Sequence, residues 1–331
     1  MWQHEAKGAG SIADIKAHLP QCTIGAIGHR VVFGGKYIQT TRIDREVLTE
    51  IERNCELAPL HNKIDLHTIT EAQQLFPHIP HFAVFDSAFH TTIPLPAAIY
   101  PIPYEWTQSG IRRFGFHGIS YQYCAKKAAM LLKHIPKKMV ICHLGSGASL
   151  CALENGKSID TTMGFTPLEG LMMDTRSGSI DPGILLYLLQ KKHLSPDTLA
   201  KALNEQSGLL GVFGRSGDMR ETLAARRDND RAHLALEIYL HRLASQIGAM
   251  IGSLGGLDCL VFTAGIGEHA PLIRERICKQ LAFLHIDLAS HQIDGQDAIL
   301  STPHSKTTVL LIHTQEAFEI ARECHELMAL S

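Results

Sequence analysis

The feature that most constrains the fold of this 331-residue chain is the alternation of short apolar segments with segments of helical periodicity. Strands alternating with helices indicate an α/β protein, here with mixed sheets. Strands are expected at 24–34, 81–86, 139–145, 149–153, 158–162 and at the apolar runs that begin at 258 and 307. Helices are expected at 3–16, 41–54, 65–76, 120–134, 182–192, 195–207, 231–254 and after the last two strands.

The length of the chain favours two domains. The proline-rich segment 93–104 is expected to form neither a regular helix nor a central strand, because proline lacks the N–H that both structures need. We therefore expect this segment to be a crossover between the domains.

Composition excludes several classes of partner. The formal net charge is −2, which gives no reason to expect nucleic acid or an anionic membrane. No apolar run is long enough to span a bilayer, and residues 1–10 lack the apolar core of a signal peptide, so a cytoplasmic location is expected. The eight cysteines include no Cys-x-x-Cys pair and are expected to be reduced thiols. The 20 histidines show no zinc spacing, and a histidine-based metal protein stays a remote alternative.

Two glycine-rich turns are candidates for phosphate binding. Gly-Ser-Gly-Ala-Ser at 145–149 joins two strands, and Thr-Ala-Gly-Ile-Gly-Glu-His-Ala at 263–270 joins a strand to a helix. Small residues let backbone N–H groups approach an anion closely, and a helix N-terminus favours negative charge. Neither turn is a Walker A loop or a complete Gly-x-Gly-x-x-Gly motif, so purely structural turns remain the alternative.

Four charged residues near strand ends or in loops are candidates for chemistry. Arg30 and Arg176 could grip a phosphate or carboxylate with paired donors, or form structural ion pairs. Asp86 and Glu316 could hold a cation, or could cap turns.

The order of the motifs resembles that of the acetate kinase family, within the actin/hexokinase/Hsp70-like phosphotransferases. The matching stretches run from about residue 24 to the last helix and include GHRVVFGG, AVFDSAFH, GIRRFGFHG, HLGSGAS, TTMGFTPLEGLMMDTRSGSIDPG, SGLLGVFGRSGDMRET, FTAGIGEH and HTQEAFEIARE. The resemblance implies a two-domain actin/hexokinase-like (ribonuclease H-like) fold with ATP between domains that close by a hinge. It implies an N-terminal domain of 1–90 plus 318–331 and a nucleotide-binding and dimerisation domain of 91–317.

The resemblance also implies an activity: reversible transfer of the ATP γ-phosphoryl group to acetate, with Mg²⁺, by a homodimer. Implied catalytic residues are Arg30, Asp86, His117 and Arg176, with Glu316 as the Mg²⁺ ligand, partly shared with Asp86. Implied acetate-binding residues are Arg30, Val32, Leu60, Phe116 and Pro167. Implied nucleotide-binding residues are His143, Gly145, Ser146, Gly147, Asp218, Met219, Arg220, Gly265, Ile266 and Gly267.

The chain departs from the family pattern at several points. The family's opening Asn-Ala-Gly-Ser-Ser-Ser motif has no counterpart here, so the N-terminal domain is expected to be incomplete. Ser146 stands where the family has Asn, Asp174 where it has Gly, and Tyr121 where it often has His. Two alternatives therefore stay open: a degenerate or truncated member that binds nucleotide without turnover, and a propionate kinase.

Overall fold

The computed structural model describes residues 23–56, 62–289 and 296–329. The chain divides into two compact units, of which unit 1 extends to Phe89 and resumes at Gln315, while unit 2 is His90–Thr314. The proline-rich segment thus lies at the start of unit 2. Within the described part of the chain, no helix combines the length and the apolarity that a membrane crossing requires.

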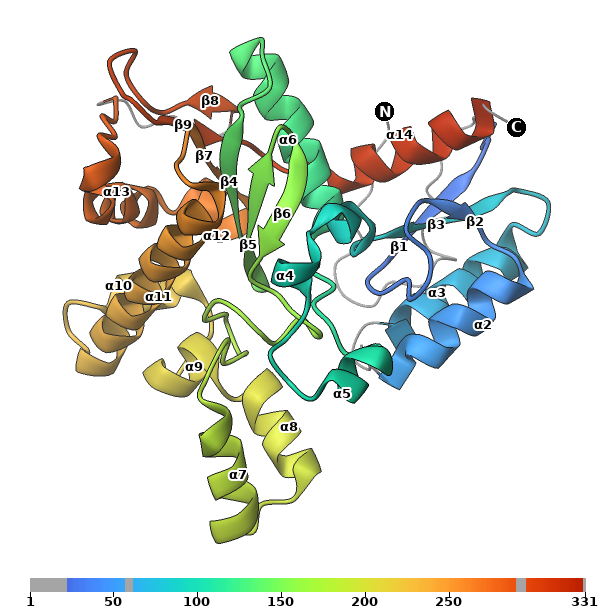
Figure 1. The fold of residues 1–331 in the computed structure, drawn as a ribbon, viewed down its shortest axis with the longest axis horizontal. Coiled ribbons are helices and arrows are strands. Elements are labelled where there is room, and N and C mark those ends of the chain that lie inside the picture. Colours follow the sequence, from blue (N-terminus) through green and yellow to red (C-terminus); the bar gives the residue numbers. More distant parts are fainter. Residues whose placement is uncertain (1–22, 57–61, 290–295, 330–331) are drawn as a thin grey trace. The chain divides into compact units, whose positions relative to one another are not determined.

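Unit 1 contains a three-stranded sheet in the order β1-β3-β2 (Figure 1). Strands β1 (Ile27–Val31) and β3 (His81–Phe85) are parallel, whereas β2 (Thr41–Arg42) runs antiparallel to β3. The helices are α2 (Arg45–Arg53), α3 (Asn62–Leu75), α14 (Glu316–Ala329) and the 3-10 turn η1 (Asn54–Glu56). Helices α3 and α14 both contact β1. The core comprises Val31, Ile43, Val47, Ile51, Ile69, Ala83 and Phe85.

Unit 2 contains a six-stranded mixed sheet in the order β6-β5-β4-β7-β9-β8 (Figure 1). Its parallel centre comprises β4 (Lys138–Leu144), β7 (Cys259–Thr263) and β9 (Thr308–Leu311). The antiparallel strands are β5 (Ala148–Glu154), β6 (Lys157–Thr161) and β8 (Ala298–Ile299). Because all five residues of β7 are buried, this strand is covered on both faces.

Helices cover this sheet. Helix α6 (Gly118–Leu132) contacts β4 and β7, and α11 (Asp230–Leu254) contacts β4, β5 and β6. The remaining elements of unit 2 are α4 (Leu95–Ala98), α5 (Tyr104–Gln108), α7 (Pro182–Lys191), α8 (Pro196–Glu205), α9 (Gly208–Phe213), α10 (Met219–Ala225), α12 (Ala264–His269), α13 (Pro271–Gln280) and η3 (Ala282–Leu284). The turn η2 (Ala88–Thr92) spans the boundary between the units.

The sequence predictions for the mixed sheets, the 139–153 hairpin and the long helix near 231–254 are confirmed. The helix expected from residue 41 begins only at Arg45, because Thr41 and Arg42 pair with β3 and the Asp44 side chain caps the helix by accepting from Val47 N. The expectation of no helix at 93–104 is wrong for Leu95–Ala98, where Pro94 and Pro96 sit at the helix start that tolerates proline. The helix expected at 3–16 lies outside the described residues.

Candidate functional site

The first part of the candidate site lies at the ends of the parallel strands β1 and β3 in unit 1. Arg30 pairs in register with Val84, and Asp86 follows β3 directly, so both side chains emerge at one edge of the sheet. Arg30 Nη2 lies 2.6 Å and Nε 2.9 Å from the same oxygen, Asp86 Oδ2. The Asp86 side chain is fully buried, whereas Arg30 remains 40% exposed and keeps N–H groups for another anion.

Two more carboxylates surround Arg30. Glu316 Oε2 lies 3.8 Å from Arg30 Nε, and Asp65 Oδ2 accepts a hydrogen bond from Val32 N at 3.1 Å. Burial raises the pKa of Asp65 to about 6 and also raises the pKa of Glu316, against the opposing effect of the Arg30 cation. The Asp86 carboxylate raises the pKa of Arg30, which therefore stays charged. Unit 1 thus presents one cation among three acidic side chains.

This acidic group fits a magnesium ion. Asp86 Oδ1 is buried and has no hydrogen-bond partner among the described residues, so it offers an unused hard oxygen ligand. Throughout the described ranges, no cluster of three or more His, Cys, Asp or Glu side chains could hold a metal ion alone. Mg²⁺ commonly needs only one or two carboxylates and takes its other ligands from phosphates and water. Asp86 and Glu316 therefore suffice only if a phosphate ligand completes the set.

Val32, one of the residues expected to bind acetate, lies in unit 1 and is 4% exposed. The next residue along the chain is held on both sides of its backbone: Phe33 N donates to Asn62 Oδ1 at 3.2 Å, and Asn62 Nδ2 donates to Phe33 O at 3.0 Å. The predicted pocket residue Leu60 lies outside the described residues.

The second part of the candidate site lies in unit 2, around the Gly-Ser-Gly turn between β4 and β5. A Cβ atom added to Gly147 would lie 2.7 Å from Arg176 Nη2 and 3.3 Å from His117 Nε2. The absence of a side chain at Gly147 thus allows an arginine and a histidine to approach the backbone of the turn. This close approach explains why the turn needs glycine at this position.

Arg176 and Phe116 are held by main-chain carbonyls and a buried histidine. Arg176 Nη1 donates to Pro167 O at 2.8 Å, and burial lowers the pKa of Arg176. His90 Nε2 donates to Phe116 O at 3.0 Å, while its Nδ1 lies 2.8 Å from Ser158 Oγ. Burial lowers the pKa of His90 to about 4, which keeps this histidine neutral. Unit 2 therefore holds Pro167 beside the Arg176 cation and Phe116 beside neutral His90 by specific contacts.

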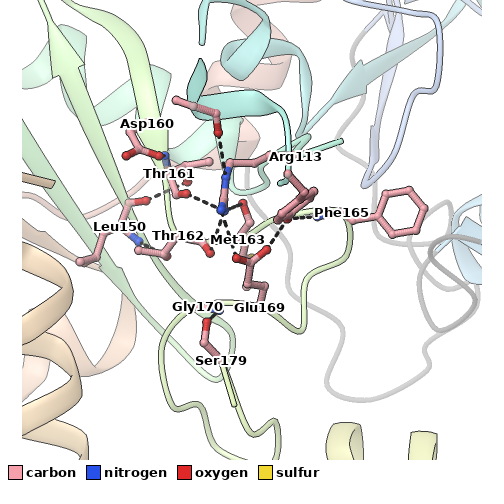
Figure 2. Close-up of polar contacts among 12 residues, drawn as sticks. Arg113, Leu150, Asp160, Thr161, Thr162, Met163, Phe165, Glu169, Gly170 and Ser179 are labelled. Atoms are coloured by element: carbon pink, nitrogen blue, oxygen red, sulfur yellow. Dashed lines mark hydrogen bonds and ion pairs between the residues drawn. The ribbon is translucent and has the colours of Figure 1, made fainter. Parts of the chain in front are cut away.

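A partly buried arginine, Arg113, fixes the loop of residues 161–169 (Figure 2). Arg113 Nη1 donates to the carbonyls of three consecutive residues, Thr161, Thr162 and Met163, at 2.9, 3.2 and 3.1 Å. Its Nη2 lies 3.1 Å from Glu169 Oε1 at the other end of the loop. The planar, forked guanidinium can make these contacts simultaneously, so one side chain defines the path of residues 161–169.

A separate cavity of about 280 Å³ lies beside the two glycine-rich turns of unit 2. Its lining includes Gly145, Ser146, Asp174, Asp218, Met219, Arg220, Gly265 and Ile266. Asp218 caps α10 by accepting from Arg220 N at 2.7 Å, and its Oδ2 lies 2.6 Å from Arg220 Nη2. Because Arg220 is 91% exposed, this ion pair orients side chains rather than stabilising the fold.

The second glycine-rich segment, expected as a turn, is helix α12, which begins at Ala264 directly after β7 and is held by the glutamate of its own motif. Glu268 Oε1 accepts from Ala264 N at 2.8 Å and from Thr314 N at 3.1 Å. Ala264 has a φ of +63°, a conformation that costs energy for a residue with a Cβ. Glu268 therefore fixes the strained first residue of α12, the helix that presents Gly265 and Ile266 to the cavity.

The predicted nucleotide residues do not all line this cavity. His143 stacks on the His117 ring at a centroid distance of 4.1 Å, and Gly147 lies beside Arg176. Gly267 is buried in α12, where an added Cβ would lie 3.8 Å from Leu144 Cβ of β4, in ordinary van der Waals contact. These three positions are thus set apart from the cavity lining.

The comparisons with known proteins identify the family of the chain. A sequence model of the acetokinase family matches residues 10–322. The chain is 51% identical to an acetate kinase of Rippkaea orientalis over 329 residues, which cover 96% of this chain and 81% of the relative.

The chain belongs to the acetokinase family.

Solved structures of related kinases share the fold of this chain. The acetate kinase of Porphyromonas gingivalis aligns with a TM-score of 0.86 and 39% identity, over 92% of this chain and 78% of that one. A propionate kinase from Francisella tularensis aligns with a TM-score of 0.86 and 42% identity, over 90% and 78%. The expected α/β fold with mixed sheets is thereby confirmed.

Sequence reasoning missed several residues that support the acetokinase site. Asp65 lies in a segment of helical periodicity, and nothing in that segment indicates its hydrogen bond with Val32 N. Arg113 and Glu169 are far apart in the sequence, so their pairing depends on the fold. Tyr121 follows His117 by four residues, a spacing that places two side chains on one face of a helix. That spacing was the one signal in the sequence for a partner of His117.

Proposed function

We propose that the chain catalyses the reversible transfer of the ATP γ-phosphoryl group to acetate, giving acetyl phosphate and ADP. The observation that carries the proposal is the convergence of Arg176 and His117 Nε2 on the backbone of Gly147. A guanidinium, an imidazole and a side-chain-free turn in one place are suited to a phosphoryl group in transfer.

The reaction requires the stabilisation of negative charge rather than a general base. Acetate is ionised at neutral pH and is already a nucleophile, so the barrier comes largely from repulsion between two anions. Arg176 would neutralise charge on the phosphoryl oxygens, and His117 Nε2 would donate to one of them as charge develops. Arg30 would bind the acetate carboxylate, and Val32, which follows in the same unit, would contact its methyl group. Mg²⁺, when bound through Asp86 and Glu316, would supply further positive charge to the nucleotide phosphates.

The cavity of unit 2 is the proposed site of the nucleotide. Its position beside both glycine-rich turns, and its lining by Gly145, Gly265 and Ile266, support the binding of a phosphorylated nucleoside. Asp218, Met219 and Arg220 at the start of α10 would contact the adenosine half.

Acetate is the proposed acceptor, and propionate is the second candidate, because a propionate kinase is among the similar structures. The bulk of buried Val32 favours the smaller acid. One additional methylene in such a pocket changes the free energy by about 1–3 kcal/mol, which limits the discrimination to roughly 10- to 200-fold.

We also propose a homodimer formed through unit 2, in the cytoplasm. Helix α7 exposes Ile184, Leu186 and Tyr187 by 46, 56 and 52%, which supports a protein contact there. All seven cysteines within the described ranges are free thiols, as in a reducing compartment.

The test is a turnover assay with ATP, Mg²⁺ and either acid, beside calorimetric titration of ADP. Formation of acetyl phosphate, with a kcat/KM for acetate above that for propionate, would support the proposal. ADP binding without turnover of either acid would contradict it and would identify a nucleotide-binding protein instead.

A further inference from the structure

The backbone conformation at His117 determines where its side chain lies. It precedes α6 with a φ of +59°, in the left-handed region that residues with a Cβ seldom adopt. Its side chain is nearly buried, and its ring stacks on His143. The ring therefore has a fixed orientation, with Nε2 beside Gly147 and Nδ1 on the opposite side.

The Nδ1 side of the ring faces a two-residue polar chain. His117 Nδ1 lies 2.8 Å from Ser149 Oγ, and the Tyr121 hydroxyl lies 2.5 Å from the same Ser149 oxygen. Ser149 and Tyr121 are both fully buried. Because Tyr121 follows His117 by four residues at the start of α6, the helix brings both side chains to one serine on β5.

The chemistry of the three groups determines the direction of the hydrogen bonds. A serine hydroxyl has one proton, so it can donate to only one of its two neighbours. A phenol is a stronger donor and a weaker acceptor than an alcohol, because its lone pairs are delocalised into the ring. Burial also raises the pKa of Tyr121 well above its usual range, so Tyr121 retains its proton. Among the arrangements that these two contacts allow, the one in which Tyr121 donates to Ser149 and Ser149 donates to His117 Nδ1 uses both hydroxyl protons.

We propose that Tyr121 and Ser149 are positioning residues that hold neutral His117 as the Nε2–H tautomer, with its proton directed toward Gly147 and Arg176. The tautomer follows from the contacts on Nδ1, since the group bound to one ring nitrogen fixes the proton on the other. The use of that Nε2–H as a donor to the transferring phosphoryl group rests on the proposed function. With the other tautomer, Nε2 would present a lone pair to the phosphoryl oxygens and would repel them.

The tautomer can be measured without any assay of activity. Protein labelled with [¹⁵N]histidine gives long-range ¹H–¹⁵N spectra that distinguish protonated from unprotonated ring nitrogens, and the His117→Gln variant assigns the His117 signals by difference. The expected result at neutral to mildly alkaline pH is an unprotonated Nδ1 and a protonated Nε2. A protonated Nδ1 in the native chain would overturn the proposal even if the protein proves inactive.

Two variants and one control test the source of the tautomer. Ser149→Ala removes the donor to Nδ1 and should shift His117 toward a mixture of tautomers, while Tyr121→Phe keeps the ring and should cause a smaller shift in the same direction. Ser120 Oγ lies 2.8 Å from His143 Nδ1, so Ser120→Ala should move the signals of His143 and not the tautomer of His117. An unchanged His117 tautomer in both Ser149→Ala and Tyr121→Phe would overturn the proposal.

Kinetics provide the second readout. Ser149→Ala should lower kcat by about tenfold with KM values for acetate and ATP changed less than about twofold, because the donor acts only on developing charge. Tyr121→Phe should lower kcat by a smaller factor. An increase in KM at constant kcat would contradict the proposed role, because it would indicate a loss of ground-state binding only.

Discussion

At the scale of single residues, the most unusual charge in the candidate nucleotide site is Asp174. This carboxylate lines the cavity together with Asp218 and the Gly145–Ser146 turn. Burial, followed by the negative charge of Asp218, raises the pKa of Asp174 to about 6, and Arg176 partly opposes the shift. The group thus changes its charge close to neutral pH, next to the proposed position of nucleotide phosphates.

We predict that Asp174 weakens nucleotide binding as the pH rises. Ionisation between pH 5 and 7 would place a second anion near the phosphates, so ADP affinity should fall across this window by about three- to tenfold, or about 1 kcal/mol. Asp174→Asn should bind ADP more tightly at pH 8 and hardly differently at pH 5. Calorimetry with Mg²⁺-free ADP, at matched pH for both proteins, compares the two directly. Parallel pH profiles for the two proteins would contradict this role.

The same shift has a stability consequence with a defined sign. Because the folded-state pKa of Asp174 exceeds the unfolded value, the folded chain binds the proton more tightly than the unfolded chain does. The contribution of Asp174 to stability is therefore complete below the unfolded pKa of about 4 and is lost as the pH rises through about 6. Urea unfolding at pH 5 and at pH 7.5 measures the free energy of unfolding at each pH. This free energy should fall less between pH 5 and pH 7.5 for Asp174→Asn than for the native chain.

At the scale of elements, loops rather than helices carry most of the site, and one side chain defines the 161–169 loop. Arg113 binds its first three carbonyls and Glu169 at its end (Figure 2). Gly170 N then donates to Ser179 Oγ at 3.0 Å, which ties the loop to the segment after Arg176. The position of Pro167, and through its carbonyl that of Arg176, depends on these contacts.

We predict that Arg113→Lys destabilises the fold by about 2 kcal/mol and raises the KM for acetate, because an ammonium cannot reproduce the forked contacts and leaves buried carbonyls unsatisfied. The neighbouring Arg112 provides a matched control, because its one described hydrogen bond is a 3.4 Å contact to the carbonyl of Arg113. Denaturant midpoints and acetate titrations of both lysine variants measure the difference. Equal effects of Arg112→Lys and Arg113→Lys would show that the network does not define the loop.

Periodic elements could be predicted from the sequence, and the site could be predicted only in part. The hairpin around the Gly-Ser-Gly turn and the helix Asp230–Leu254 follow from apolar spacing that no tertiary contact has to override. The short strand Thr41–Arg42 could not be predicted, because two residues carry no periodicity and their pairing with β3 is a tertiary effect. Motifs gave Arg30, Asp86, His117 and Arg176, but the partners that hold His117 and Arg176, which are Ser149 and the carbonyl of Pro167, are defined by the fold.

At the scale of the whole molecule, helix α7 of unit 2 exposes three large apolar side chains, Ile184, Leu186 and Tyr187. Helix α7 has no buried residue, whereas α11 buries nine of its residues. Figure 1 shows α7 beside α8. The apolar side chains of 231–254 are therefore largely buried inside unit 2, so α7 is the better candidate for the proposed dimer contact.

We predict that Leu186→Glu combined with Tyr187→Glu converts a dimer into a monomer, because burial of the introduced charges in an interface is costly. Lys201→Glu on α8 introduces a charge change at another exposed position and should leave the dimer intact. Light scattering coupled to gel filtration reports the masses. A dimer that survives the double substitution would exclude α7 as the interface.

We expect this chain to transfer phosphoryl groups to acetate with Arg176 as a catalytic cation. Its most direct test traps acetyl phosphate as the hydroxamate from acetate, ATP and Mg²⁺, with the native chain, Arg176→Ala and the control Arg112→Ala side by side. Product is expected from the native chain and the control, with a loss of at least about a hundredfold in Arg176→Ala, as for the removal of a charge-stabilising group. Product formation at the native rate in Arg176→Ala, or none in any folded protein, would contradict this role of Arg176 and this activity.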